Sequence, residues 1–408
     1  MTAIATGIFK QLVAKKQSAL GTKASAASAQ LFRRVTSTID LNKATYTSAE
    51  IRPSQMRSDM RHGVRSVSGT ISGELSPGTY QGFTESILRA AFASVSAYNA
   101  GTDVTASATA PHFTDASGGF ITAGLKVGMV GRWTGFAGAG ATDNNGRNFL
   151  ITVLTATEMS GVFLDGTAVV ADAAADDVTF TPVGKYCAVP TTGHTRDYWT
   201  IEHSFTDLDL SEQFTDCAIS SMAVRLPATG MATVDFSVMG LNMDTSSGAS
   251  APYFTSPTAA STTGTLAAVN GALYVEGVAI GTITGMDFTI AGNHSTPGGV
   301  VGSNVDPDIF PGAIDVSGNM TVLFSSATMR DYFVNETEVE VIAAFTTDNT
   351  ATADFQVWNF PRVKVGGASK DDGEKGLTMT MPFVALENVN AATGTIATVA
   401  WVQDSDAA

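Results

Sequence analysis

An internal duplication is the feature of this sequence that most constrains its fold. Four segments of the first half recur in the same order in the second half. They pair as Val64–Leu75 with Asp315–Phe324, Trp199–Phe205 with Val339–Phe345, Phe214–Val224 with Phe355–Val365, and Met231–Leu241 with Gly376–Leu386. A long loop precedes the first segment of each set, Arg52–His62 in one half and Ala291–Gly312 in the other. Because repeated order indicates repeated structural units, the chain is predicted to hold two copies of one domain.

The two copies are predicted to consist mainly of strands. Only 15% of the residues are charged, against about 25% in a typical globular protein, and Gly, Ser, Thr and Ala fill the difference. Hydroxyl and β-branched side chains suit pleated strands, and glycine suits the turns between them. Helical spacing follows one strand of each copy, in Tyr80–Ala93 and from Ala327 to Val334, so each copy is expected to carry one short helix.

An insertion interrupts the first copy. Its short apolar segments are separated by Gly, Asn and Asp turns, which predicts a small β-barrel or sandwich of its own. Since insertions are tolerated at exposed loop tips, this unit is expected to project outward. The predicted division of the chain is an N-terminal basic arm (1–36), the first repeat (37–97 and 196–243), the insertion (98–195), a linker (244–267), the second repeat (268–390) and a C-terminal tail (391–408).

Positive charge is concentrated near the N-terminus. Residues 1–65 contain 11 Lys and Arg against 3 Asp and Glu, whereas the rest of the chain contains 12 against 35. A basic leader on an acidic body fits either nucleic-acid binding or docking on a neighbouring copy. The leader has few aromatic side chains for base stacking, which favours docking. Its apolar residues Ile4, Ile8, Phe9, Leu12 and Val13 share a helical stripe, which predicts a short amphipathic helix before an extended arm.

The sequence contains no recognisable catalytic, cofactor-binding or metal-binding pattern. The five histidines occur singly, without the paired spacing of a metal site. No nucleophile elbow or phosphate-binding loop is present. Asp172, Asp176 and Asp177 fit a solvated turn better than a Ca²⁺ site. We therefore expect a protein that is not an enzyme and that uses no cofactor.

Membrane anchoring and export are not expected either. No window approaches the 18 consecutive apolar residues of a membrane span. Lys10, Lys15 and Lys16 follow the first apolar residues, which reverses the order of a secretory signal. The cysteines Cys187 and Cys217 are accordingly expected to be reduced and buried, although two cysteines also allow one bridge.

With the repeat laid out, the chain resembles the phage tail tube protein family, whose fold is shared with type VI secretion tubes. The likeness is carried by Val64–Leu75 and Asp315–Phe324, strands that each lie between a long loop and a helix. The leader residues Phe9-Lys10-Gln11-Leu12-Val13-Ala14 are similar to the start of such proteins. Phe113–Phe120 with Val127–Val130 is similar to an accessory domain that some members carry.

This resemblance implies a mostly β chain with two tandem tail-tube β-sandwich or barrel domains, each with a short helix, and a small inserted β-barrel. Family domains close in sixes around a channel, and the rings stack into a tube through which double-stranded DNA passes without specific binding. Two domains per chain then predict homotrimeric, pseudo-hexameric rings. Tape measure, tail terminator and distal tail proteins are the further partners expected. The implied location is the virion tail, after assembly in the host cytoplasm.

Two groups of residues are predicted to serve assembly and DNA passage. Contacts between subunits or stacked rings are assigned to the leader and the long loops, at Phe9, Lys10, Lys15, Lys16, Arg33, Arg34, Arg57, Arg61, Asp306 and Asp308. Lumen-facing carboxylates are expected at the strand positions Glu74, Glu202, Glu338 and Glu340, because a negative lining repels the phosphate backbone. The strand pattern alone equally allows an outer-face position for these glutamates.

Two rival classes share the composition. A surface adhesin or carbohydrate-binding β-protein is the alternative, and the missing export signal argues against it. A β-rich hydrolase would need a carboxylate pair in a cleft. Asp306 and Asp308 flank a proline, and a turn with proline at its second position explains them equally well.

Overall fold

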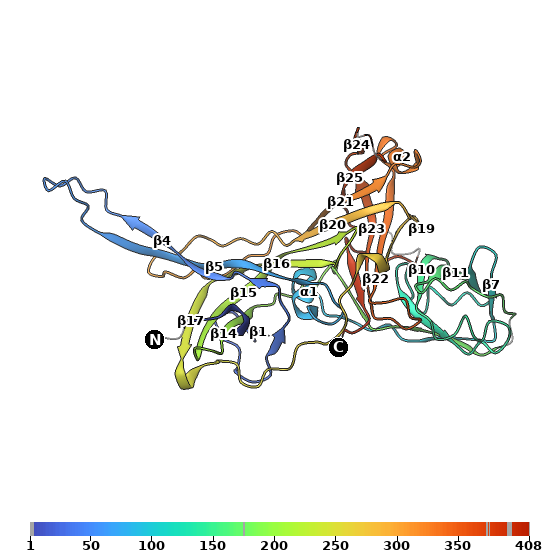
Figure 1. Cartoon of the computed structure of the whole chain (residues 1–408), viewed down its shortest axis with the longest axis horizontal. Coiled ribbons are helices and arrows are strands. Elements are labelled where there is room, and N and C mark those ends of the chain that lie inside the picture. The colour runs from blue at the N-terminus through green and yellow to red at the C-terminus, as the bar shows by residue number, and fades with distance from the viewer. Residues whose placement is uncertain (1–3, 174–175, 373, 375, 390–393, 408) are drawn as a thin grey trace.

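The protein is built mainly from β-strands, as the sequence predicts. The computed structural model describes residues 4–173, 176–372, 374, 376–389 and 394–407. Two short α-helices occur in this part of the chain. Figure 1 shows an elongated molecule in which a long hairpin extends from one end and the insertion lies at the opposite end.

The two repeats contain matching sets of elements. The first repeat comprises β3 (Thr36–Ser37), β4 (Asp40–Thr47), β5 (Met60–Glu74), α1 (Gln81–Leu88), β14 (Trp199–Phe205), β15 (Leu210–Pro227) and β16 (Thr233–Gly240). The second repeat comprises β18 (Gly271–Val275), β19 (Val278–Ala279), β20 (Ile283–Ala291), β21 (Asp315–Leu323), α2 (Thr328–Val334), β22 (Glu338–Thr346), β23 (Phe355–Val365), β24 (Ser369–Lys370) and β25 (Thr378–Ala385).

The strands of both repeats are hydrogen-bonded in the same order. In the first repeat the antiparallel ladder runs β4–β5–β16–β15–β14. In the second it runs β20–β21–β25–β23–β22. The Val-Ser-Gly segment, which both repeats contain, pairs with the equivalent strand in each: Val67 lies opposite Gly240 at the end of β16, and Val316 lies opposite Ala385 at the end of β25. The topology therefore supports the duplication inferred from sequence.

One of the sequence matches has the wrong register. Trp199 lies opposite Cys217, and its counterpart Val339 lies opposite Val363. Cys217 therefore corresponds to Val363, so Phe214 corresponds to Phe360 and not to Phe355. The strands β15 and β23 are equivalent, but both are almost continuously buried here. A buried strand gives no alternation with which to fix an alignment.

The sheets of the two repeats each have one apolar and one polar face, because side chains alternate along strands such as β16 and β25. In β16, Val234, Phe236 and Val238 are buried, while the residues between them are partly exposed. In β25 the buried set is Met379, Met381, Phe383 and Ala385. This period of two places the apolar residues of both strands on one side, where they contribute to the main core.

The two helices differ in how firmly they pack. α1 buries Phe83, Ile87 and Leu88 in the main core and ends at Arg89, which has the left-handed conformation (φ 58°). α2 buries only Met329. The predicted helix of the first repeat is thus confirmed but shorter than Tyr80–Ala93, because the left-handed residue stops it.

The insertion forms a separate sheet with its own aromatic core. Its strands are β6 (Tyr98–Gly101), β7 (Val104–Ser107), β8 (His112–Asp115), β9 (Val130–Thr134), β10 (Phe149–Leu154), β11 (Glu158–Phe163) and β12 (Val178–Pro182), in the order β6–β12–β9–β10–β11–β8–β7. Trp133 and Phe149 both contact Phe113 at its centre. This core also includes Ile342, Phe355 and Trp401 of the second repeat and the C-terminal segment, so the insertion is anchored on its flank and not only by its two connections.

The leader does not contain the amphipathic helix expected from its apolar spacing. A 3-10 turn, η1 (Gly7–Phe9), is followed by β1 (Lys10–Lys16), which lies between β14 and the short β2 (Gln30–Phe32). Neighbours cover both faces of β1, so Leu12, Val13 and Ala14 are all buried. The apolar run that suggested a helical stripe is the mark of a covered strand. β1 pairs with β14 as β18 pairs with β22, so the leader supplies the first strand of the first repeat.

The linker and the C-terminus are also part of the folded body. β17 (Asn242–Ser247) pairs with β15, and after the turns η2 (Gly248–Ser250) and η3 (Ala268–Asn270) the chain enters the second repeat. Near the C-terminus, β26 (Trp401–Asp404) is buried between β23 and β13 (Lys185–Ala188), the strand that leads out of the insertion. Cys187 and Cys217 are free and buried, as expected.

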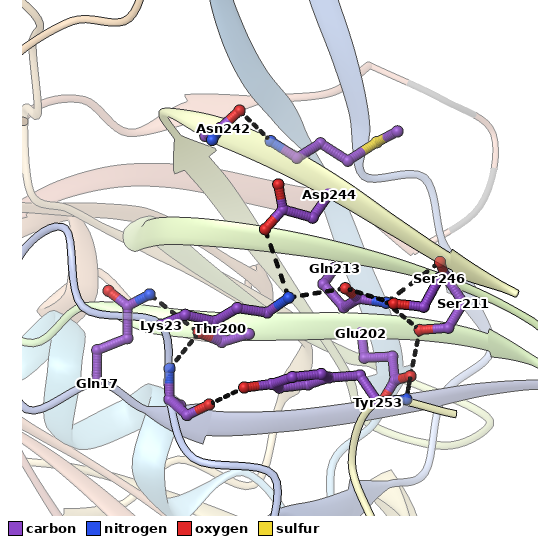
Figure 2. A network of polar contacts seen from close by, with 12 residues as sticks. Gln17, Lys23, Thr200, Glu202, Ser211, Gln213, Asn242, Asp244, Ser246 and Tyr253 are labelled. Atoms are coloured by element: carbon purple, nitrogen blue, oxygen red, sulfur yellow. Dashed lines mark hydrogen bonds and ion pairs between the residues drawn. The ribbon is translucent and has the colours of Figure 1, made fainter. Parts of the chain in front are cut away.

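Glu202 holds the linker against the first repeat. Its carboxylate is fully buried and accepts hydrogen bonds from the backbone N–H groups of Tyr253 (2.7 Å) and Phe254 (2.9 Å) and from the Ser211 hydroxyl. Figure 2 shows this contact within a wider polar network that includes Lys23 of the leader. A buried carboxylate of this kind is stabilised only while all its donors are in place.

We expect Glu202→Gln to lower the free energy of unfolding by about 2 kcal/mol, because the amide nitrogen would face a backbone donor that it cannot satisfy. Glu338→Gln is the matched control, since Glu338 is exposed and its ion pair with Arg362 is of the surface type. Solvent screening makes such exposed pairs contribute little to stability. Urea unfolding of both variants measures the difference. Equal losses in the two would contradict the role given to Glu202.

Candidate assembly surfaces

The two repeats are joined by main-chain pairing between β15 and β20, which we call the joint. Seven residue pairs form it, from Ser221 opposite Ala291 to Pro227 opposite Gly285. Its core-facing side chains are buried on both strands: Met222, Val224 and Leu226 on β15, and Met286, Phe288 and Ile290 on β20. One sheet therefore continues from β4 through both repeats to β25.

The polar face of this continuous sheet is rich in hydroxyl groups and carries sparse, mainly negative charge. One row of directly opposed residues runs across it from Glu74 through Thr233, Arg225 and Asp287 to Asn319. A neighbouring row is Ser72, Asp235, Ala223, Thr289 and Ser317. Arg225 lies 3.7 Å from the Asp235 carboxylate, which offsets part of its positive charge.

Two sheet edges have no strand partner among the residues described. β3 and β4 pair only with β5, so the outer edge of Thr38–Asn42 is open. At the other end, β24 pairs only with β25. Unpaired edges of this kind are sites where another strand is readily added.

The second long loop docks on the first repeat. Arg196 donates to the Asp308 carboxylate at 3.0 Å, and the Tyr198 hydroxyl donates to it at 2.6 Å. Burial raises the pKa of Asp308, but the hydrogen bonds from Tyr198 and Arg196 outweigh this effect and hold the pKa below its usual value. Arg89 donates to the carbonyl oxygens of Gly292 and Gly312 at the two ends of the loop. In Figure 1 the loop runs beside the hairpin of β4 and β5, where Asn304 accepts from the Arg65 N–H.

The residues predicted to contact other copies fall into two groups: those that already bind groups of their own chain or are buried, and those that are exposed. Most of the leader cations bind groups of their own chain: Lys10 the Ser37 carbonyl, Lys15 Ser25 and Ala27, Lys16 Glu85 and Asp197, Arg33 Ser76 and Thr79, and Arg34 the carbonyls of Gly7 and Lys10. Asp306 is buried and Asp308 joins the two repeats, so neither is free for another copy. Phe9 is half exposed, and Arg57 and Arg61 are exposed on the hairpin.

The four glutamates expected on the lumen occupy different environments. Glu74 lies exposed on the polar face. Glu202 is fully buried under the linker, and so it does not reach a solvent-lined surface. Glu338 is exposed on β22, paired with Arg362 at 2.7 Å. Glu340 of β22 is largely buried, and burial raises its pKa to about 7, although Asn359 donates to it at 2.9 Å. The sequence pattern missed Asp235, Asp287 and Asp315, which do lie on the polar face.

The open edges, the joint and the polar face fit a subunit that assembles side by side with other copies. A comparison with protein families shows which family the chain belongs to. The model of the phage tail tube protein family matches residues 10–401. The chain belongs to this family. No curated protein matched the chain in a separate comparison. The tail tube match begins at the first residue of β1 and ends at the first residue of β26, so it includes the leader strand and the insertion.

Membership makes this chain a structural protein of the bacteriophage tail, and the family implies self-assembly alongside other tail components. No helix in the described part of this tail tube protein is long and apolar enough to cross a membrane. Within the same residues, no group of three or more His, Cys, Asp or Glu side chains is placed to hold a metal ion.

Removal of residues 2–9 is expected to lower the unfolding temperature of the tail tube protein only slightly, because Ile4, Ile8 and Phe9 are exposed and only a few peripheral hydrogen bonds, such as that from Arg34 to the Gly7 carbonyl, are lost. Removal of residues 2–16 is expected to lower it strongly or to abolish soluble expression, since β1 is a central, buried strand. Thermal unfolding by circular dichroism measures both. A stable, cooperative 2–16 deletion would contradict the assignment of β1 to the core.

Glu340 is expected to make stability depend on pH. Its folded pKa of about 7 lies above the usual 4.5, so its contribution is fully present below about pH 4.5 and is lost as the pH rises through 7. Glu340→Gln keeps an acceptor for Asn359 and removes the buried charge. We expect the variant to exceed the parent by about 2 kcal/mol at pH 8.5 and to equal it at pH 4.

Urea unfolding at the two pH values tests this expectation. Glu387→Gln is the control at an exposed position of the same repeat, and it should stay within about 0.5 kcal/mol of the parent at pH 8.5. A gain for Glu340→Gln at pH 4 as large as that at pH 8.5 would show that relief of a buried charge is not the cause.

Proposed function

We propose that three copies of this chain close one ring and that stacked rings form the tube through which DNA leaves the phage particle. The observation that carries this proposal is the joint. It joins the edges of two equivalent sections of sheet within one chain. The continuous sheet ends in two further open edges of the same kind, one at β4 and one at β24. Three chains supply the six sections that the resemblance to tail tube domains implies.

Pairing in a closed ring satisfies every edge. A linear array would always leave one edge strand open at each end, and open edges recruit further strands without limit. Rotational closure removes both ends at once and gives a defined copy number. Ring formation would thus cover both exposed edges and prevent indefinite lateral growth.

The polar face of the continuous sheet is the surface that we assign to the channel. It presents short hydroxyl side chains, with Glu74, Asp235, Asp287 and Asp315 against Arg225. Sparse negative charge repels the phosphate backbone, and no basic cluster on these rows offers DNA a place to bind. DNA would therefore pass without specific contacts. Glu74 is the member of the originally expected glutamates that this assignment retains.

The resemblance to tail tube proteins supports the remaining parts of the proposal. The chain acts as a building block without enzymatic chemistry, and its neighbours at the ends of the tube are the tape measure, tail terminator and distal tail proteins. Assembly takes place in the host cytoplasm before the virion is complete. The insertion, anchored on the second repeat, lies once per chain and so three times per ring.

Electron microscopy of the purified protein tests the proposal directly. We expect rings or stacked tubes with threefold symmetry and two similar sheet sections per chain, with the face of Glu74 and Asp287 lining the channel. Native mass spectrometry of isolated rings should give three chains. Six chains per ring, or monomers under every assembly condition, would refute the proposal.

A further inference from the structure

The open edge near β24 is structurally equivalent to the strand that forms the joint. In the first repeat, Ala223 lies opposite Asp235 and Val224 opposite Val234. In the second, Ser369 lies opposite Thr380 and Lys370 opposite Met379. Asp235 and Thr380 occupy the same position of their repeats, because each lies five residues before the partner of an equivalent valine, Gly240 opposite Val67 and Ala385 opposite Val316. Ser369 is thus the counterpart of Ala223, which faces Thr289 across the joint.

The open edge of β4 is equivalent to the other strand of the joint. Asp40 lies opposite Ser68 and Leu41 opposite Val67. Their counterparts in the second repeat are Thr289 opposite Ser317 and Ile290 opposite Val316. Asp40 therefore corresponds to Thr289, and Leu41 corresponds to Ile290. One chain therefore carries counterparts of both strands of the joint, with β24 at one end of its continuous sheet and β4 at the other.

We propose that the seam between neighbouring copies reproduces the joint residue for residue. β24 of one copy pairs antiparallel with the Thr38–Asn42 edge of the next, with Ser369 opposite Asp40, Ala368 opposite Leu41 and Lys370 opposite Ile39. This inference rests on the proposed ring and names the surface and the register by which it closes. The partner is a second copy of this chain.

Apolar groups at the two edges are incompletely covered in the single chain. Leu41 packs against the main core at one edge, and Ala368, Val365 and Phe324 pack against it at the other. All four are only partly buried. In the joint, the equivalent positions Met222 and Ile290 are both buried. Pairing at the seam places Ala368 beside Leu41 and completes the same cover.

Local contacts limit how far the seam extends. The Nζ of Lys10 donates to the Ser37 carbonyl at 2.8 Å, at the point where a partner strand would otherwise donate. The Leu41 N–H is bound by its neighbour Asp40 at 2.7 Å, a contact that a partner carbonyl replaces when the strand is added. The open edge is therefore short and partly protected before assembly, as edges of soluble proteins usually are.

The ion pair beside the joint is not repeated at the seam. At the joint, Asp308 of the loop that follows β20 binds Arg196, three residues before Trp199 of β14. The counterpart of Arg196, three residues before Val339, is the exposed Glu336, and the loop that follows β4 carries Glu50 and Asp59 as well as Arg52 and Arg57. A carboxylate in place of Arg196 disfavours exchange between the two kinds of contact, since it would meet Asp308 as a like charge.

A cysteine pair tests the register. Asp40→Cys with Ser369→Cys places the two residues directly opposite, in a pair whose Cα atoms are about 4.5 Å apart if the seam copies the joint, which is within disulfide reach. The native thiols are buried with raised pKa values and should not compete. After mild oxidation of assembled tubes, we expect covalent dimers and trimers on a non-reducing gel.

The matched control is Thr47→Cys with Ser369→Cys, at an exposed position about 23 Å further along the same strand. It should give no cross-linked species. Tubes that form without a cross-link between positions 40 and 369, or that cross-link equally at position 47, would overturn the register while leaving the tube function intact. Wild-type protein that never forms rings would overturn both.

Ala368→Pro provides a second test that does not depend on disulfide formation. It removes an outward-facing N–H from the β24 edge and leaves the pairing of Ser369 with Thr380 in place. We expect a folded single chain with an unfolding temperature close to that of the parent and at least a tenfold loss of tubes by sedimentation. Normal tube yield from this variant would contradict the seam.

Discussion

Main-chain pairing across the joint is the interaction on which the rest of this structure depends. Seven consecutive residue pairs hold β15 against β20, and the apolar side chains beneath them merge the cores of the two repeats into one. Without that pairing each repeat would expose a central strand edge and a strip of Met, Val and Phe side chains. The joint therefore sets the relative position of the repeats, the continuity of the polar face and the placement of the remaining open edges.

Segments outside the regular ladders complete the first repeat. β1 occupies the place that β18 occupies in the second repeat, and the linker is held by a buried carboxylate at Glu202. Most cations of the leader bind carboxylates, hydroxyls or carbonyls of the same chain. The positive charge of the N-terminal segment therefore helps to attach it, while Lys43 and Arg57 are exposed on the hairpin.

Periodicity was sufficient to predict a mostly β chain and many of its strands, whereas the family was indicated by a resemblance in the order of strands, long loops and helices. Periodicity failed where both faces of a strand are covered, because such a strand loses its alternation. For this reason the apolar spacing of the leader predicts a helix where β1 lies, and the sequence alignment of β15 with β23 has the wrong register. It also failed for Glu202 and Glu340, since alternation indicates a face but not whether a linker or a second sheet covers that face. The joint was not predictable, because nothing local in β15 or β20 specifies its partner.

The fusion of two sheet sections in one chain has a consequence for counting. Every chain that enters a ring contributes its sections in pairs, since the joint holds them together. A closed ring of such chains contains an even number of sections, so rings of five or seven cannot arise by the gain or loss of one section. The smallest possible error is a whole chain, which changes the circumference by two sections and strains every contact in the ring. In the proposed ring, the duplication thus prevents the number of sections, and with it the diameter of the channel, from changing by a single section.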